Sequence, residues 1–287
     1  MGRHKSNLLS ICPGFLIVLL ACMPVDAQAQ ARAFGESFPV GSLAAVGNVD
    51  AIGAGRGIAI MNNPAHVAWG SQWSVSGGYR RLYELEYLQR VWSAAKYRRA
   101  VWGIGLAVSR FGKEDFYTET ETAVSFALRV RRNLALGIDL RNLRLAYTPT
   151  MPSYAGWSLG FGMICRPISA VLVTGSIRHA LQEDFIPGYD LPRRYHLSAA
   201  ANLPGNVYLC AGWQKSEDDR DILGLGQKIR LAKNFAFLCA VYFDPARYAL
   251  GGELIVRGQS IYYSYLSHPE IGGTHYIEFE ITQSLTD

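Results

Sequence analysis

Hydrophobic and polar residues alternate one by one over several segments after about residue 72. Near the C-terminus, Ile277, Phe279 and Ile281 alternate with Glu278 and Glu280. The same period of two recurs in residues 102–109, 123–130, 157–163 and 235–243. A period of two places successive side chains on opposite faces of a strand. Because the less hydrophobic face is often Gly, Ala and Ser rather than Lys and Glu, the pattern is unusual for a strand with one face in water.

Short turns and longer loops alternate between these strand-length segments, of which we count fourteen. The tight connections fall at residues 97–100, 131–133, 166–169, 203–206, 232–234 and 257–259. The connections between them are mostly longer, as at residues 180–192 and 268–274. A transmembrane barrel with an even number of strands has short turns on one side and long loops on the other. Backbone polar groups in a bilayer must all be paired, so such a sheet must close.

We therefore predict an all-β fold, a 14-stranded antiparallel transmembrane β-barrel over residues 72–287. A soluble β-sandwich that buries its apolar faces together is the alternative. Residues 139–147 break the strict alternation, and we expect a bulge near Asn142 to restore the register.

The N-terminus has the pattern of an export signal. Arg3 and Lys5 precede an apolar run that ends near Cys22, and a small-x-small pattern ends at Ala29. The run is shorter than the about 20 residues that a spanning helix needs. Residues 1–29 are thus predicted to be a signal peptide, with lipidation of Cys22 open beside cleavage near Ala29. The expected location is the bacterial outer membrane, with outer-membrane lipid around the barrel.

Residues 30–71 are rich in Ala, Gly and Asn. They contain Gly47-Asn48 and then Asn62-Asn63-Pro64-Ala65, just ahead of the first strand. This combination resembles the N-terminal signature of FadL-like outer-membrane barrels, in particular the PorV/PorQ-type branch. Members of that family usually carry acidic residues before the Asn-Pro-Ala tripeptide. This chain has Gly-Ala-Gly-Arg-Gly at residues 53–57 instead, so an acidic contact shared with the family is in doubt.

The resemblance implies two functions of different classes. The PorV/PorQ-type branch implies a non-enzymatic barrel that serves protein secretion or surface attachment through secretion-machinery or envelope partners. The broader superfamily implies a channel for uptake of small hydrophobic molecules.

The same segment is predicted to be an N-terminal plug. Barrels of about 8 strands fill their interior with side chains, and those of about 16–18 strands leave an aqueous channel. A barrel of fourteen strands lies between these cases, so a segment of small residues is a suitable filler. A simple lead-in to the first strand is the alternative role.

Charge and composition limit the kinds of binding partner that we expect for this protein. Charged residues are 18% of the chain, and the formal net charge is +5. Because much of the basic excess sits in the short turns rather than in one groove, no nucleic-acid partner is expected. Charged residues that we predict to face the lumen, where they would fix the plug or line a path, are Glu278, Glu280, Asp139, Arg129 and Arg141.

Motifs for catalysis, cofactors and metals do not occur in the sequence. It has no Gly-x-Ser-x-Gly elbow and no Cys/His spacing typical of a metal site. His196 and Ser198 would share a strand face, but the neighbouring sequence supplies no orienting carboxylate. We therefore expect no enzyme activity and no cofactor. In the partly apolar loop at residues 182–192, Phe185 and Ile186 are candidate contacts for a hydrophobic ligand or a docking partner.

Overall fold

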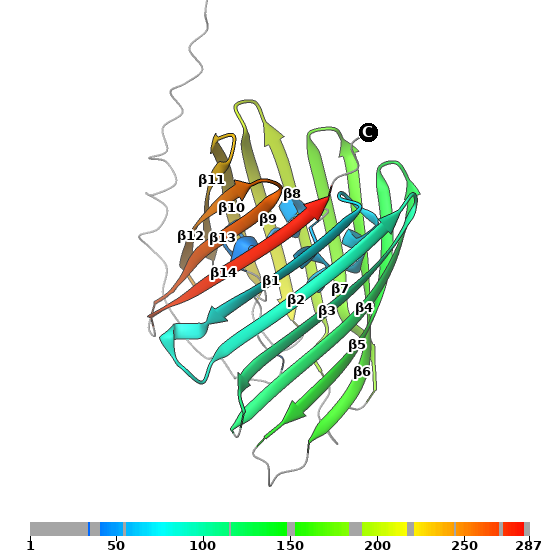
Figure 1. Cartoon of the computed structure of the whole chain (residues 1–287), viewed down its shortest axis with the longest axis vertical. Coiled ribbons are helices and arrows are strands. Elements are labelled where there is room, and N and C mark those ends of the chain that lie inside the picture. The colour runs from blue at the N-terminus through cyan, green and yellow to red at the C-terminus, as the bar shows by residue number, and fades with distance from the viewer. Residues whose placement is uncertain are drawn as a thin grey trace, which may run out of the picture.

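Fourteen antiparallel strands close into a barrel in the computed structural model (Figure 1). The structure describes residues 34, 41–53, 56–114, 116–147, 153–183, 191–216, 221–243, 245–269 and 272–283. The strands within these residues are β1 (Trp73–Arg81), β2 (Gln89–Arg99), β3 (Trp102–Lys113), β4 (Tyr117–Arg131), β5 (Leu134–Ala146), β6 (Tyr154–Ile168), β7 (Val171–Gln182), β8 (Arg194–Leu203), β9 (Val207–Ser216), β10 (Ile222–Ala232), β11 (Phe235–Phe243), β12 (Arg247–Val256), β13 (Gln259–His268) and β14 (Gly272–Gln283). A short 3-10 helix, η6 (Leu82–Glu84), lies in the first loop.

The first and last strands form the seam of the barrel. β1 pairs with β14 from Trp73 opposite Gln283 to Arg81 opposite His275. Every other strand pairs with its neighbours in the sequence. The predicted barrel is confirmed, and the sandwich alternative is wrong.

Apolar side chains cover the outer wall. On β3, Ile104 and Leu106 are about half exposed, at 48% and 49%, whereas Gly103, Gly105 and Ala107 between them are buried. The same alternation occurs on β4, β11 and β14. An apolar band of this extent belongs in lipid rather than in water. The chain is thus a membrane barrel of the bacterial outer-membrane type.

The expected bulge near Asn142 is wrong. Pairing runs without a break through Asn142 on both sides of β5. The register shifts instead at Arg129/Arg131, Leu159/Phe161, Cys165/Ile168 and Arg230/Ala232. The polarity of the two faces reverses towards the loop end of β5. There Leu143 and Leu145 point inward and are buried, and Arg144 is exposed, as expected where the outer wall meets water.

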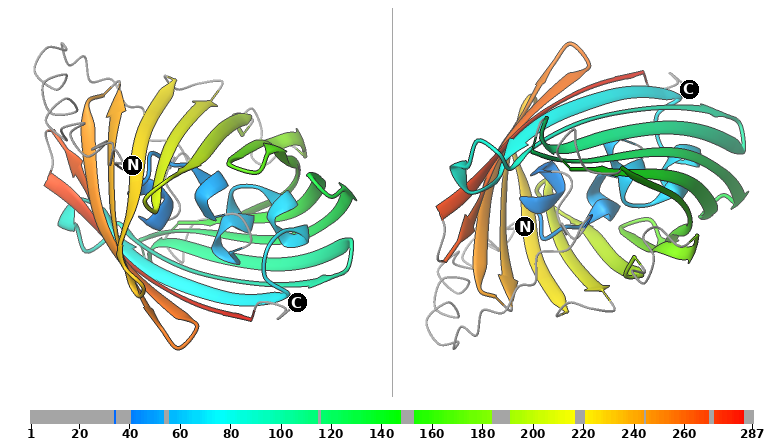
Figure 2. Two further views of the ribbon diagram at one scale, coloured as in Figure 1. Left: turned by 90° about the horizontal axis from the view of Figure 1, so that it is seen from above. Right: turned by 90° about the horizontal axis from the view of Figure 1, so that it is seen from below.

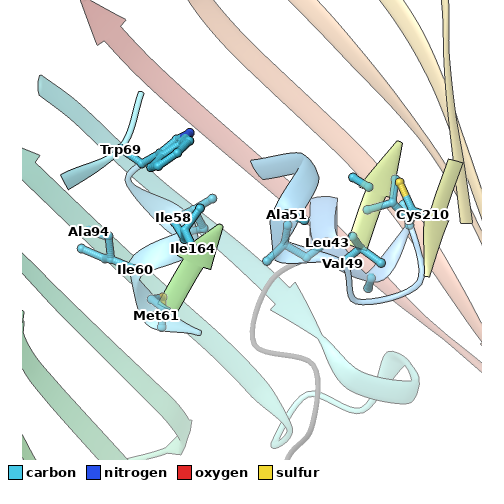
Figure 3. Packing of buried hydrophobic residues seen from close by; sticks show 14 of the residues in the cluster. Leu43, Val49, Ala51, Ile58, Ile60, Met61, Trp69, Ala94, Ile164 and Cys210 are labelled. Carbon is cyan, nitrogen blue, oxygen red and sulfur yellow. The ribbon is translucent and has the colours of Figure 1, made fainter. Parts of the chain in front are cut away.

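Residues 41–53 and 56–72, which we call the inner segment, lie inside the barrel (Figure 2). The inner segment contains four short helices: α1 (Gly41–Ala44), η3 (Asp50–Gly53), η4 (Ile58–Met61) and η5 (Pro64–Ala68). Its apolar residues form the main buried core together with inward-facing residues of the wall. Figure 3 shows two groups in this core, one that includes Ile58, Met61, Trp69 and Ile164, and one that includes Leu43, Val49 and Cys210.

Inward-facing glycines let the inner segment approach the wall closely. A Cβ at Gly103 would lie 2.2 Å from the carbonyl oxygen of Val67, and one at Gly226 would lie 2.3 Å from the carbonyl carbon of Val46. At Gly162 it would lie 2.0 Å from the side-chain oxygen of Asn63. Because no real Cβ fits at such distances, these wall positions require glycine.

Among the described residues, no helix is long and apolar enough to cross a membrane.

Candidate functional site: the lumen and its inner segment

The residues of the Asn-Pro-Ala signature connect the inner segment to the wall. The Asn63 side chain accepts a hydrogen bond from the Ala65 N–H at 3.0 Å and so caps η5. Its Nδ2 donates to the carbonyl oxygens of Met163 (3.1 Å) and Gly175 (3.2 Å). Pro64 stands at the start of η5, where its missing N–H costs nothing.

The Gly-Asn pair makes a left-handed turn earlier in the segment. Gly47 has φ 82° and Asn48 has φ 57°, a conformation that Gly and Asn tolerate best. Gly47 packs against the backbone of Gly224. The Asn48 side chain donates to Gln214 at 2.7 Å, so this turn is tied to β9 and β10.

Asp50 of the inner segment is fully buried and contacts polar side chains from both the wall and the inner segment. The hydroxyls of Ser198 (2.6 Å) and Thr174 donate to its Oδ1, and Nε2 of His66 lies 3.3 Å from Oδ2. Burial alone would raise the pKa of the Asp50 carboxyl. The imidazoles of His196 and His66 and the Ser198 hydroxyl outweigh burial and hold this pKa below its usual range.

This arrangement explains why His196 and Ser198 do not form a nucleophile and base. The Ser198 hydroxyl donates to a carboxylate rather than to an imidazole. Nε2 of His196 lies 2.7 Å from the carbonyl oxygen of Asn48. Both side chains therefore hold the inner segment in place.

Glu278 and Glu280, two of the predicted lumen charges, face inward near the seam. Glu278 accepts the N–H groups of Gly41 and Ser42, the latter at 3.0 Å. Glu280 accepts the Gly57 N–H at 2.8 Å and lies 3.7 Å from Nε of Arg56.

Arg56 links these carboxylates to a second ion pair, which Glu253 and Lys228 form. Its guanidinium lies 2.9 Å from Glu253 and 4.5 Å from the ring centroid of Tyr262, and Lys228 also pairs with Glu253. Burial would lower the pKa of Arg56, but Tyr262 and Glu253 together with Glu280 hold it above its usual value.

Asp139 and Arg141 form a separate group on β5. Arg141 pairs with Asp139 (2.6 Å) and with Glu121, and its Nη2 donates to the carbonyl oxygen of Met61 at 3.1 Å. Arg178 also pairs with Glu121, at 2.7 Å. The predicted lumen charges therefore contact different parts of the inner segment.

Arg129 lies apart, at the turn end. It is half-buried, donates to the carbonyl oxygen of Ala68 at 3.3 Å and stands 4.9 Å from the ring centroid of Trp69. Arg166 lies 5.4 Å from the same ring, and Lys96 donates to the carbonyl oxygens of His66 and Trp69. Three cations thus contact Trp69: Arg129 and Arg166 lie near its ring, and Lys96 bonds to its carbonyl oxygen.

Sequence reasoning missed Asp50, Arg56, Glu253 and Lys228. A signal for the two wall residues, Glu253 and Lys228, was available from the alternation of side chains along a strand. Lys228, for example, is an even number of positions from Gly224 and Gly226 on β10, which face inward. No comparable signal marks Asp50 or Arg56, since the inner segment has no periodic pattern.

A small apolar cluster lies at the loop end of the lumen, next to buried charged side chains. Its buried members are Phe34, Leu143, Leu145 and Leu191, and Tyr117 and Tyr154 pack against them. We call these six residues the Phe34 site. The Phe34 N–H donates to Glu119 at 2.8 Å, and Arg194 donates to the Phe34 carbonyl oxygen. Phe185 and Ile186, the predicted loop contacts, lie outside the described residues, as do residues 1–29.

A small polar cavity lies between wall and inner segment, lined by Asn48, Asn62, Arg178, Arg194, His196 and Gln214. Its volume of about 20 Å³ gives room for about one water molecule. In the part of the chain that the structure describes, no three His, Cys, Asp or Glu side chains gather as a metal site requires.

No protein-family model matches the chain, and no curated protein matches its sequence. Solved structures do match its fold. The Ralstonia pickettii toluene transporter TbuX is 12% identical with a TM-score of 0.62, and the match covers 85% of this chain and 98% of that one. The Pseudomonas putida toluene transporter TodX is 9% identical with a TM-score of 0.54, covering 79% and 94%. A Pseudomonas aeruginosa FadL homologue is 13% identical with a TM-score of 0.52, covering 81% and 97%.

The chain has the FadL-like barrel fold. The barrel fold that the resemblance around residues 47–65 implies is thus confirmed. These neighbours are named as toluene transporters and as a FadL homologue.

Proposed function

We propose that the protein is an outer-membrane channel for small hydrophobic molecules of about the size of one aromatic ring. The observation that carries this proposal is the Phe34 site, an apolar site inside the loop end of the lumen. Leu143, Leu145 and Leu191 line it with Tyr117 and Tyr154, and one benzyl side chain occupies it. Two of the proteins with this fold are named as toluene transporters, and a benzyl group has the size and shape of toluene.

The inner segment is the plug in this proposal. Its backbone reaches the wall at the inward glycines, and its side chains bond to strands around the barrel. A hydrophobic molecule enters at the loop end and rests at the Phe34 site. Its onward passage requires the inner segment to shift.

Uptake of radiolabelled toluene into proteoliposomes tests the proposal. Leu145→Asn puts a polar amide into the apolar site and is expected to lower the uptake rate at least about tenfold. Arg144→Gln is the matched control, because Arg144 is next in the chain but faces outward, and it should leave uptake unchanged. Equal rates for wild type, both variants and protein-free liposomes would contradict the channel.

A second function, docking of a secretion or envelope partner, is favoured by the charge of the short turns. Residues 97–103, 129–134, 164–171, 201–207, 230–235 and 254–260 contain no Asp or Glu. Exposed basic residues on this rim are Arg99, Arg131, Arg132, Arg166, Arg230, Lys233 and Arg257. Short turns face the periplasm in outer-membrane barrels, so an acidic periplasmic protein is the partner that fits.

Purification from native membranes in mild detergent separates the two functions. A partner lost both at high salt and in an Arg131→Gln, Arg132→Gln, Lys233→Gln triple variant supports docking. Toluene uptake by protein that has no stable partner supports the channel alone.

A further inference from the structure

We infer that the Phe34 site binds small aromatic carboxamides, which offer both a carbonyl oxygen and an N–H group. This inference rests on the proposed channel function and specifies its ligand class. Phe34 acts as a built-in ligand, and the groups that hold it show what a free ligand must offer.

The ring of Phe34 defines the apolar part of the ligand. Phe34 is 6% exposed and packs with Leu143, Leu145 and Leu191. Tyr117 and Tyr154 close the site from the partly exposed side. A single ring therefore fills the space that these side chains leave.

The backbone of Phe34 defines the polar part. Its carbonyl oxygen accepts from the Arg194 guanidinium, and its N–H donates to Glu119. Arg194 and Glu119 are both buried, at 4% and 5% exposure. If a hydrocarbon displaced Phe34, each would lose a hydrogen bond in a site poor in water. Sites built to hydrogen-bond a ligand strongly reject analogues that lack the bonding group.

The charges around the site favour an acceptor over a cation. Nη2 of Arg90 lies 3.5 Å from Glu119, whose other oxygen accepts from the Tyr117 hydroxyl. Arg178 stands opposite Arg194 in the register of β7 and β8. Arg90 and Arg194 thus flank the Glu119 carboxylate at the ligand position. A third arginine, Arg178, pairs with Glu121 nearby. An amide offers an oxygen to Arg194 and an N–H to Glu119, whereas a carboxylate offers no donor to Glu119 and an ammonium group offers no acceptor to Arg194.

The conformation of Phe34 favours its release. Its φ of 55° is left-handed, which is costly for a bulky side chain without special contacts. The contacts that hold Phe34 are those a ligand would replace, so a ligand and the Phe34 side chain compete directly for the site.

Isothermal calorimetry on the purified full chain in detergent tests this inference, with benzoate, benzamide, toluene and benzylamine as probes. Phe34→Ala removes the built-in competitor and is expected to raise benzamide affinity at least about tenfold over wild type, and benzoate affinity by less. Adding Arg194→Gln should lower both affinities about tenfold and change toluene affinity less than about threefold. Arg193→Gln in the same background is the matched control, because Arg193 is adjacent but exposed. Benzylamine should not bind.

Toluene binding as tight as that of benzamide in Phe34→Ala, with no effect of Arg194→Gln, would overturn the inference while leaving the channel intact. Failure of all four probes to bind Phe34→Ala, with wild type that also takes up no toluene, would overturn both. Heat-modifiable mobility on gels verifies that each variant is folded. Phe34→Leu, which keeps an apolar side chain without a ring, replaces Phe34→Ala if the latter does not fold, with the same expected order of probes.

Discussion

The two ends of the lumen are built from different chemistry. At the loop end, Leu143, Leu145 and Leu191 surround Phe34, and the nearby arginines are paired with carboxylates. At the turn end, Trp69 is surrounded by Arg129, Arg166 and Lys96. The loop end therefore has the composition of a recognition site. At the turn end, cation–π contacts and hydrogen bonds to main-chain carbonyls hold the inner segment to the wall.

The largest expected effect comes from Asp50, which anchors the inner segment between the two ends. Asp50→Ala removes a buried carboxylate that Ser198, Thr174 and His66 contact. We expect a loss of about 3–5 kcal/mol in the free energy of unfolding, as for a buried pair with one partner removed. Urea unfolding in lipid vesicles measures it. Asp50→Asn, which keeps an acceptor, should lose less, and equal stability of Asp50→Ala and wild type would refute the anchoring role.

Acid should weaken the same anchor. The pKa of Asp50 is lowered in the folded protein, so its contribution to stability is complete above the unfolded pKa of about 3.9. That contribution is lost as pH falls further, towards the folded pKa. The stability difference between wild type and Asp50→Asn should therefore shrink below about pH 4. A difference that stays constant from pH 7 to pH 3 would contradict this account.

Gly103→Val tests whether the turn end can be opened by itself. The added side chain would collide with the backbone of Val67, and overpacking of this kind costs about 1–3 kcal/mol. We expect displacement of η5 and a higher conductance in planar bilayers, with toluene binding at the loop end retained. Gly252→Val is the control, because its Cβ would meet only ordinary contacts at 3.5 Å from Phe235. Loss of toluene binding in Gly103→Val would show that the ends are not independent.

The smallest expected effect is at Arg166, whose guanidinium lies over Trp69 at the turn end. Arg166→Gln removes one exposed cation–π contact, worth about 0.5–1 kcal/mol. Brief openings of the channel should become a few times more frequent in single-channel recordings. Arg99→Gln removes an exposed arginine of the same rim and should not change the recordings.

The barrel could be predicted from the sequence because its signal is periodic. Alternation on β3, β4, β11 and β14 shows which residues face lipid, and the alternation of short turns and long loops predicts the closed sheet. The error at Asn142 arose because a change in the surroundings of β5 looks the same as a slip in register. Inward Leu143 and Leu145 beside outward Arg144 reflect water outside the loop end, not an extra residue.

The lumen could be predicted only in part. Glu278 and Glu280 are on a regular strand, so their inward direction follows from parity. Two partners of Asp50 on the wall, Thr174 and Ser198, are 124 and 148 residues away, and the segment that carries Asp50 has no period. Phe34 is a single residue whose contacts come from Glu119 and Arg194 on distant strands. Such contacts depend on the three-dimensional closure of the sheet, which no local pattern records.

The order in which the inner segment touches the wall has a consequence for assembly. α1, its earliest helix, contacts the last strands, β13 and β14, whereas η5, its latest helix, contacts β2 to β6. Gly57 of the inner segment and Ser74 of β1 both donate a hydrogen bond to Glu280 of β14. The segment can complete its contacts only after the final strand has reached the first. Docking of the inner segment therefore depends on a complete barrel. A barrel that lacks β14 leaves α1 and Arg56 without the surface that binds them.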